Sequence, residues 1–171
     1  EKAGQSCCMG DIGVHAFNMI EFTTGLKTTK VLADLNTLYE DNPLDIDGTA
    51  MCQFDNGARG LVRASQIATC EENNLRIAVY GTKAGIKWEQ ENPNYLYFME
   101  EGKPVQVLKP GHAYNGELSA ISTKIAPGHP EGIFDSMGNI YSGAAKAIRG
   151  EKYIDGAFPT VHEGVRGMKF I

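Results

Sequence analysis

The stretch GTAMCQFDNGARGLVRA at residues 48–64 decides the fold of this chain, because it encodes two strands joined by a tight turn. Asp55-Asn56-Gly57 lies at its centre, and Asn-Gly accepts the positive φ angles that a hairpin turn requires. A short connection of this kind joins antiparallel neighbours, since a parallel return needs about a dozen residues or more. The stretch therefore predicts an antiparallel hairpin.

The two-residue period of this hairpin continues through residues 28–108. Such a period indicates strands. Turn residues such as Gly, Pro and Asn divide the segment at residues 81–85, 92–94 and 101–103. We therefore predict a mainly antiparallel sheet. The expected strands cover residues 30–38, 48–54, 58–68, 75–80, 86–89, 95–100 and 104–108.

The first predicted helix covers residues 11–24. Asp11 is a suitable N-cap residue, and Gly25 is a suitable residue for ending the helix. At 3.6 residues per turn, one stripe of this helix is mostly apolar and should face the core. A separate stripe, about 100° away, carries three polar side chains. Its members are Asp11, His15, Asn18 and Phe22.

Two further helices are expected in the second half of the chain. Residues 131–149 have helical spacing and end at Gly150, and Thr160-Val161-His162-Glu163 has the spacing of a capping box for a last helix. Residues 109–130 show no period and are predicted to form a long loop. One face of the helix over residues 131–149 should cover the sheet. That face consists of Ile133, Met137, Ile140, Tyr141, Ala144 and Ile148.

Helices placed around an antiparallel sheet predict an α+β architecture in a single domain over residues 1–171. The helices are expected on one face of an open sheet. Apolar residues occur on both sides of the strands, since Val31, Ala33 and Leu35 alternate with Leu32 and Leu38. We therefore predict that the uncovered face packs against a second copy in a homodimer or homotetramer.

Charge and composition argue against several classes of partner. Lys plus Arg number 16 against 21 Asp plus Glu, which gives a net charge of -5. With no basic run, we expect no nucleic-acid partner. No apolar stretch approaches the roughly 20 residues that cross a bilayer, so we expect no membrane association. The cysteines lack CxxC spacing, which predicts free thiols and favours the cytoplasm. They are Cys7, Cys8, Cys52 and Cys70.

Four motifs in this order resemble the glucose-fructose oxidoreductase and inositol dehydrogenase family (Gfo/Idh/MocA). MGDIGVH at residues 9–15 is similar to the Gly-x-x-Asp-x-Gly-x-His motif that opens the family's C-terminal domain. FDNGARG at 54–60 and LRIAVYGTKAGIKW at 75–88 resemble its strand-turn-strand segments. HPEG at 129–132, followed by NIY at 139–141, resembles its last long helix.

The resemblance implies a fold like the C-terminal domain of glyceraldehyde-3-phosphate dehydrogenase. It also implies a preceding Rossmann domain, absent from this chain, that binds most of NAD or NADP. The parent protein would oxidise a CH-OH group of a sugar or cyclitol, and this half alone would be inactive. The lysine of the family's Glu-Lys-Pro motif belongs to the absent domain.

The resemblance assigns catalysis to His15 and Asp11. An imidazole that titrates near neutrality suits the base that removes a hydroxyl proton, and a carboxylate one turn earlier can bind a hydroxyl group or orient the ring. Taken alone, the pair is also compatible with a helix cap and a surface histidine. A zinc site with Cys7 and Cys8 is disfavoured, because adjacent cysteines seldom both reach one ion. We therefore expect no metal.

Further candidate substrate-binding residues are Asn18, His112, Tyr114 and His162. Two other functions stay open at this point. One is a noncatalytic sugar-binding or scaffold domain of the same fold. The other is a glycosidase that uses nicotinamide without net oxidation, as some relatives of the family do.

Overall fold

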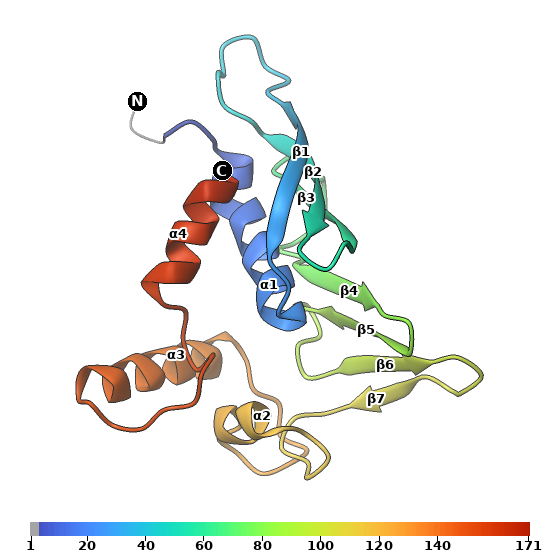
Figure 1. Cartoon of the computed structure of the whole chain (residues 1–171), viewed down its shortest axis with the longest axis vertical. Coiled ribbons are helices and arrows are strands. Elements are labelled where there is room, and N and C mark those ends of the chain that lie inside the picture. The colour runs from blue at the N-terminus through green and yellow to red at the C-terminus, as the bar shows by residue number, and fades with distance from the viewer. Residues whose placement is uncertain (1–3) are drawn as a thin grey trace. The chain divides into compact units, whose positions relative to one another are not determined.

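The structure is a computed structural model that describes residues 4–171. Its elements form two compact units, both visible in Figure 1. Of the described residues, the first unit contains residues 4–72 and 161–171, and the second unit contains residues 73–160. Both combine antiparallel strands with helices, so the predicted α+β class is confirmed. One domain can contain two such units, so the expectation of a single domain stays a prediction.

The first unit contains a three-stranded antiparallel sheet in the order β1-β2-β3. Its strands are β1 (Thr28–Asn36), β2 (Asp47–Phe54) and β3 (Arg59–Ser65). The predicted hairpin is confirmed, because β2 pairs with β3 and places Met51 opposite Leu61. In the turn, Gly57 has a φ of 88°. The Phe54 N–H donates a hydrogen bond of 3.0 Å to the Ala58 carbonyl, which closes the turn.

The core of the first unit lies between one face of this sheet and the helical segment that precedes it. Alternate residues of β2 and β3 point to this face, as the period of a strand requires. Cys8 and Met9 pack against them from the helical segment. The buried cluster consists of Cys8, Met9, Ala50, Cys52, Phe54, Val62 and Ala64.

The helical segment consists of a π-helical turn, η1 (Met9–Gly13), followed by α1 (Val14–Thr24). The predicted end is confirmed, since Gly25 adopts a left-handed conformation with a φ of 71°. The predicted start is wrong. Asp11 lies inside η1, where its N–H already donates to the Cys7 carbonyl at 2.8 Å, so Asp11 is not the N-cap.

Asp45 caps the start of this helical segment from a distant loop. Its Oδ1 accepts from the Cys7 N–H and its Oδ2 from the Met9 N–H, each at 2.7 Å. Its backbone carbonyl accepts from the Cys8 N–H at 2.9 Å. The residue is buried. Burial alone would raise the pKa of Asp45, but the hydrogen bonds from Met9 and Cys7 hold it below the ordinary value of 3.8.

Met9 connects the helix start to β2, and two glycines leave space for its side chain. A Cβ at Gly48 would lie 2.8 Å from the Met9 Cγ, and a Cβ at Gly13 would lie 2.9 Å from the Met9 Sδ. Cores are too closely packed to accept such overlaps without displacement. Gly13 and Gly48 therefore allow the close approach of helix and sheet.

The helix α4 (Val161–Phe170) packs along α1, and the two run side by side in Figure 1. The rings of Phe17 and Phe170 stack with their centroids 4.3 Å apart. Gly167 is buried, and a Cβ there would lie 2.8 Å from the Val14 Cγ2. A small residue at this position therefore sets how closely the helices approach.

Glu21 joins α1 to α4 and to the start of β1. The Arg166 Nε donates to the Glu21 Oε2 at 3.1 Å, and the Arg166 Nη2 donates to Oε1. The Thr28 N–H donates to the same Oε1 at 2.8 Å. Glu21 is 5% exposed. Burial would raise the pKa of Glu21, but the hydrogen bonds from Arg166 and Thr28 hold it below its ordinary value.

The second unit holds the remaining strands in a separate four-stranded antiparallel sheet of order β4-β5-β6-β7. Its strands are β4 (Arg76–Tyr80), β5 (Ala84–Glu89), β6 (Leu96–Glu100) and β7 (Gln106–Leu108). The sequence predicts one sheet for all strands, whereas the hydrogen bonds divide them into two. Between β3 and β4, Cys70 and Asn74 have φ angles of 67° and 43°. Positive φ angles do not fit a continuous strand.

Two helices follow in the second unit. α2 (Glu117–Ser122) lies in the region predicted to be a loop, and α3 (Ile133–Ile148) confirms the helix predicted over residues 131–149. The Gly132 N–H donates to the Asp135 carboxylate at 2.8 Å where α3 begins. Among residues 4–171, no helix is long and apolar enough to cross a membrane.

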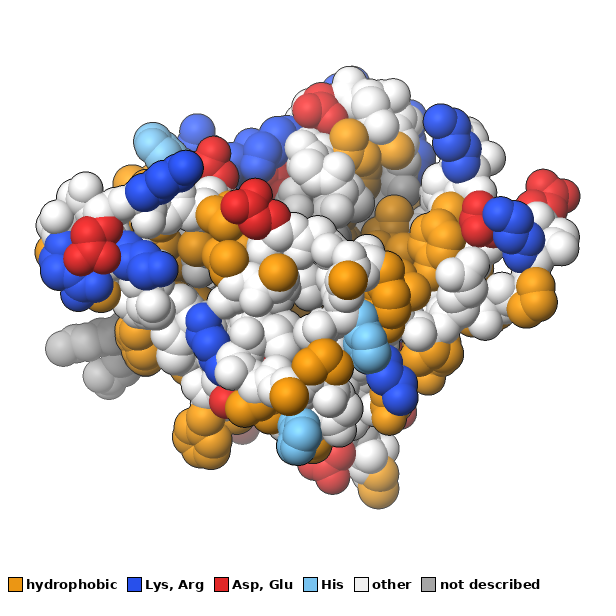
Figure 2. All heavy atoms as spheres, turned by 90° about the horizontal axis from the view of Figure 1, so that it is seen from below, with side chains coloured by type: hydrophobic (Ala, Val, Ile, Leu, Met, Phe, Trp, Pro, Cys, Tyr) orange, Lys and Arg blue, Asp and Glu red, His pale blue; other side chains and the backbone are white. Residues whose placement is uncertain are grey.

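The predicted packing face of α3 is wrong. Ile133, Tyr141 and Ile148 are 68%, 66% and 86% exposed, so this face covers no sheet. The side of α3 that is buried is the one with Gly143, which approaches Ala157. Figure 2 shows exposed hydrophobic side chains between charged ones on the face that it displays. Helical spacing identifies an apolar face but does not identify its partner.

Glu21→Gln is expected to lower the free energy of unfolding by about 2 kcal/mol. The substitution removes the charge that pairs with Arg166 and leaves that guanidinium without its carboxylate. Urea unfolding followed by circular dichroism measures the change. The matched control is Glu100→Gln, because Glu100 pairs with Lys103 at the surface at 3.0 Å. It should change the free energy by less than about 0.5 kcal/mol. Equal losses of stability in Glu21→Gln and Glu100→Gln would contradict the prediction that the buried Glu21 carboxylate stabilises the fold.

Asp45→Asn is expected to lower the free energy of unfolding near neutral pH by about 2 kcal/mol, because an amide has one acceptor oxygen instead of two. Folding lowers the pKa of Asp45, so its contribution is present above the unfolded value and is lost as the pH falls through the folded value. The difference between wild type and Asp45→Asn should therefore shrink as the pH falls below 3.8. Urea unfolding over a pH series measures it.

The control for this series is Asp34→Asn, which removes an exposed carboxylate from β1. It should change stability by less than about 0.5 kcal/mol at each pH. A difference between wild type and Asp45→Asn that stays constant across the acidic range would show that the charge of Asp45 does not stabilise the helix start.

Candidate functional site

Asp11 and His15 lie one turn apart where η1 joins α1. Asp11 belongs to the π-helical turn, and His15 is the second residue of α1. The Val14 N–H bonds back to the Met9 carbonyl, which closes this wide turn. π-helical turns are rare and occur frequently at functional sites. The local backbone thus agrees with a functional role for this helix.

The side chains of Asp11 and His15 are exposed. Within residues 4–171, neither side chain forms a hydrogen bond or an ion pair with another part of the chain. A carboxylate and an imidazole on one exposed helix face provide an acceptor and a proton-transfer group at neighbouring positions. The pair is therefore available to a hydroxylated ligand.

Two buried carboxylates hold the helix that presents this pair. Asp45 binds the backbone at its start, and Glu21 binds Arg166 and Thr28 near its end. A helix fixed at both ends can present functional groups with little freedom, which is what catalytic positioning requires. Sequence reasoning missed Asp45 and Arg166 as positioning residues. No local signal identifies them, because Asp45 lies 38 residues from Cys7 in the chain.

The other candidate residues fall into both units. Asn18 lies half-buried in α1, and His162 lies exposed in α4, so both belong to the first unit with Asp11 and His15. His112 and Tyr114 belong to the second unit. Their rings stack with centroids 5.1 Å apart. Their proposed contact with substrate stays a prediction.

Cys7 and Cys8 do not form a metal centre with Asp11 and His15. Among the residues that the structure describes, no group of three His, Cys, Asp or Glu side chains could hold a metal ion. Cys8 is fully buried. Burial, together with the negative charge of Asp45, raises the pKa of the Cys8 thiol to about 11. With this raised pKa, the Cys8 thiol stays protonated near neutral pH and packs as part of the core.

The segment over residues 81–85 does not form a dinucleotide cradle. It connects β4 to β5 in an antiparallel hairpin, whereas a phosphate-binding Gly-rich loop lies between a strand and a helix. The Gly81 N–H donates to the Ala84 carbonyl at 2.9 Å, which is a turn within the hairpin. This segment therefore offers no site for the phosphates of a nicotinamide cofactor.

Known proteins resemble this chain over nearly its whole length. An uncharacterized oxidoreductase, YfiI, from Bacillus subtilis (strain 168) is 28% identical over 178 residues, which cover 99% of this chain and 45% of that protein. The structure of an oxidoreductase from Sinorhizobium meliloti is 38% identical, with a TM-score of 0.87, and the match covers 95% of this chain and 48% of that one.

An inositol dehydrogenase homolog from Azotobacter vinelandii, complexed with NADH and myo-inositol, is also similar. It is 26% identical with a TM-score of 0.82, and the match covers 98% of this chain and 46% of that one. The chain thus spans about half the length of these relatives.

The family model described as the GFO/IDH/MocA C-terminal domain matches residues 1–87. These residues include the motif with Asp11 and His15, the FDNGARG segment at 54–60 and residues 75–87 of the following segment. The resemblance is therefore confirmed. This chain belongs to the Gfo/Idh/MocA family of oxidoreductases, as its C-terminal domain.

Proposed function

We propose that this chain is the substrate-binding and oligomerising half of an NAD(P)-dependent oxidoreductase that acts on a CH-OH group of a sugar or cyclitol. One observation carries the proposal. Asp11 and His15 are exposed, without partners among the described residues, on a helix held at both ends by buried carboxylates. The myo-inositol and NADH in the complex of the Azotobacter vinelandii homolog support the substrate class and the cofactor.

His15 serves as the base in this proposal. Oxidation of a secondary alcohol removes the proton of its hydroxyl group and a hydride from the carbon that carries this group. A bound nicotinamide ring would accept the hydride. The imidazole of His15 accepts the proton. The carboxylate of Asp11 accepts a hydrogen bond from a neighbouring hydroxyl group and fixes the orientation of the sugar ring. Since the described residues offer no phosphate cradle, we assign cofactor binding mainly to the part of such proteins outside this chain.

The outer face of the first sheet supports the proposal of a homodimer or homotetramer. Leu32, Met51 and Leu61 lie opposite one another on adjacent strands and form a cross-strand row. They are 66%, 54% and 60% exposed. Clustered exposed apolar side chains mark interaction sites, and a closed symmetric contact of this sheet with its own copy would cover them.

We also propose a cytoplasmic location for the protein. All four cysteines are free thiols, and such thiols persist in a reducing compartment.

His15→Ala in the full-length oxidoreductase is expected to reduce kcat by about a hundredfold or more, because the base is removed. Initial rates of NAD(P) reduction with a panel of sugars and cyclitols, including myo-inositol, measure the effect. His15 is exposed, so the urea midpoint should stay close to that of the wild type, which controls for misfolding. Activity within severalfold of the wild type would remove His15 from the role of base.

Met51→Lys is expected to convert the oligomer to a smaller species, because it places a charge in the centre of the apolar row. Light scattering coupled to size exclusion measures the mass. Val105→Lys serves as the matched control, since Val105 is 57% exposed but lies directly before β7, outside the first sheet. A wild-type chain that is monomeric at micromolar concentration, or an unchanged mass after Met51→Lys, would exclude this interface.

A further inference from the structure

The helix α1 has apolar side chains on all of its sides. At 3.6 residues per turn, its apolar residues point in every direction around the helix axis. No Lys or Arg occurs between residues 11 and 24, and Glu21 is buried. A surface helix normally gathers its charged and polar residues on one side, whereas a helix that is apolar all round is buried. The composition of α1 is therefore that of a helix covered on every side. Its apolar residues are Val14, Ala16, Phe17, Met19, Ile20 and Phe22.

The described residues cover two sides of α1. Ala16 and Ile20 pack against the buried cluster of the first unit. Phe17 stacks on Phe170 of α4. On the remaining side, His15 and Phe22 are exposed, and the exposed fraction of Phe22 is 57%. We call this side, which carries His15 and Phe22, the open side of α1.

Phe22 extends the open side beyond the candidate site. It lies seven residues after His15, which is about two turns, so the two residues share one side and lie about 10 Å apart along the helix axis. Asp11 lies about one turn from His15 in the opposite direction. A single sugar ring held by Asp11 and His15 therefore leaves Phe22 free to contact a second body. Aromatic residues are enriched at the centres of protein interfaces, and charged residues are depleted there.

The proposed function requires a second body on the open side. Hydride transfer brings the acceptor to within about 3.5 Å of the carbon whose hydroxyl group His15 deprotonates. Cofactor binding is assigned mainly to protein outside this chain, and the chain spans about half the length of its relatives. We call that protein the cofactor-binding part. It must approach the open side of α1 for the reaction to occur.

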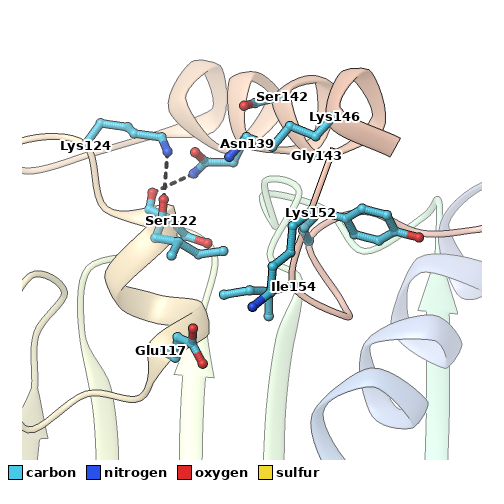
Figure 3. A pocket seen from close by; sticks show the side chains of 12 residues that line it. Glu117, Ser122, Lys124, Asn139, Ser142, Gly143, Lys146, Lys152 and Ile154 are labelled. Carbon is cyan, nitrogen blue, oxygen red and sulfur yellow. Dashed lines mark hydrogen bonds between the residues drawn. The ribbon is translucent and has the colours of Figure 1, made fainter. Parts of the chain in front are cut away.

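A cavity in the second unit, which Figure 3 shows, is a poor alternative place for the cofactor. Its volume is about 340 Å³. Ligand pockets range from about 300 to 1,000 Å³, so this volume is small for a dinucleotide. None of the residues that line the cavity belongs to α1. The cavity therefore does not remove the need for a second body beside His15.

We propose that the open side of α1, with Phe22 as its main contact, binds an apolar surface of the cofactor-binding part. This contact completes the covering of α1 and places the hydride acceptor beside His15. The inference rests on the proposed function and adds the surface by which the two parts of the oxidoreductase join. Phe22 is a positioning residue, because it touches neither the substrate nor the reacting atoms.

Thiol labelling of the full-length oxidoreductase tests this contact without relying on activity. Phe22→Cys is compared with Tyr39→Cys, since Tyr39 is 61% exposed in the loop between β1 and β2 of the same unit. Iodoacetamide should alkylate Phe22→Cys at least about tenfold more slowly, because the cofactor-binding part must first move away. Mass spectrometry of peptides separates the introduced thiols from the four native cysteines, and circular dichroism checks the fold of both variants.

Phe22→Ala in the full-length oxidoreductase should lower kcat by about tenfold, because the hydride acceptor is held less well. The affinity for the sugar, measured by isothermal titration, should stay within about twofold, and Tyr39→Ala should leave both quantities within about twofold. A positioning role therefore separates kcat from substrate binding, which a general loss of folding would not do.

Equal labelling rates for Phe22→Cys and Tyr39→Cys would overturn the inference, as would equal values of kcat for Phe22→Ala and Tyr39→Ala. Slow labelling of Phe22→Cys that is lost on dilution would assign the contact to a second copy and would also overturn it. A wild-type oxidoreductase without activity on the whole panel of sugars and cyclitols would instead contradict the proposed function. The two failures are thus distinguishable.

Discussion

The buried carboxylate of Asp45 is the interaction on which the candidate site depends. It accepts hydrogen bonds from the first free N–H groups of the helix that carries Asp11 and His15. An α-helix leaves these groups unsatisfied and concentrates positive potential at its start. An ionised carboxylate accepts hydrogen bonds from these N–H groups and also interacts favourably with the positive potential. The lowered pKa of Asp45 means that it is ionised at neutral pH.

The candidate pair is exposed, whereas the two carboxylates that hold its helix are buried. Asp45 and Glu21 place their charges inside the first unit, where each is satisfied by hydrogen bonds. Asp11 and His15 make no such contacts within residues 4–171, so they retain their hydrogen-bonding capacity for a ligand. Preorganisation of this kind places the cost of desolvating charges on residues that do not react. Under the proposed function, Asp11 and His15 meet the substrate without first breaking hydrogen bonds to the described residues.

Local signals in the sequence predict local features well. The hairpin at Asn56-Gly57 and the helix end at Gly25 follow from the φ angles that these residues accept. Long-range partners leave no such signal. Asp11 is the best cap available nearby, yet the actual cap is Asp45. The exposed face of α3 is a second example. Helical spacing identifies its apolar side but does not show whether another element covers that side. The roles proposed for Asp11 and His15 follow from the resemblance to a family motif rather than from spacing.

The first unit is made of two separated segments, residues 4–72 and 161–171, with the second unit inserted between them. During synthesis, the Glu21 carboxylate therefore lacks its ion-pair partner until Arg166 leaves the ribosome. The second unit depends only on contacts within a continuous segment and has no such delay. Domains fold as units during translation, and distant contacts form slowly. The inserted unit should therefore fold first, and the helix that carries Asp11 and His15 should be fixed last.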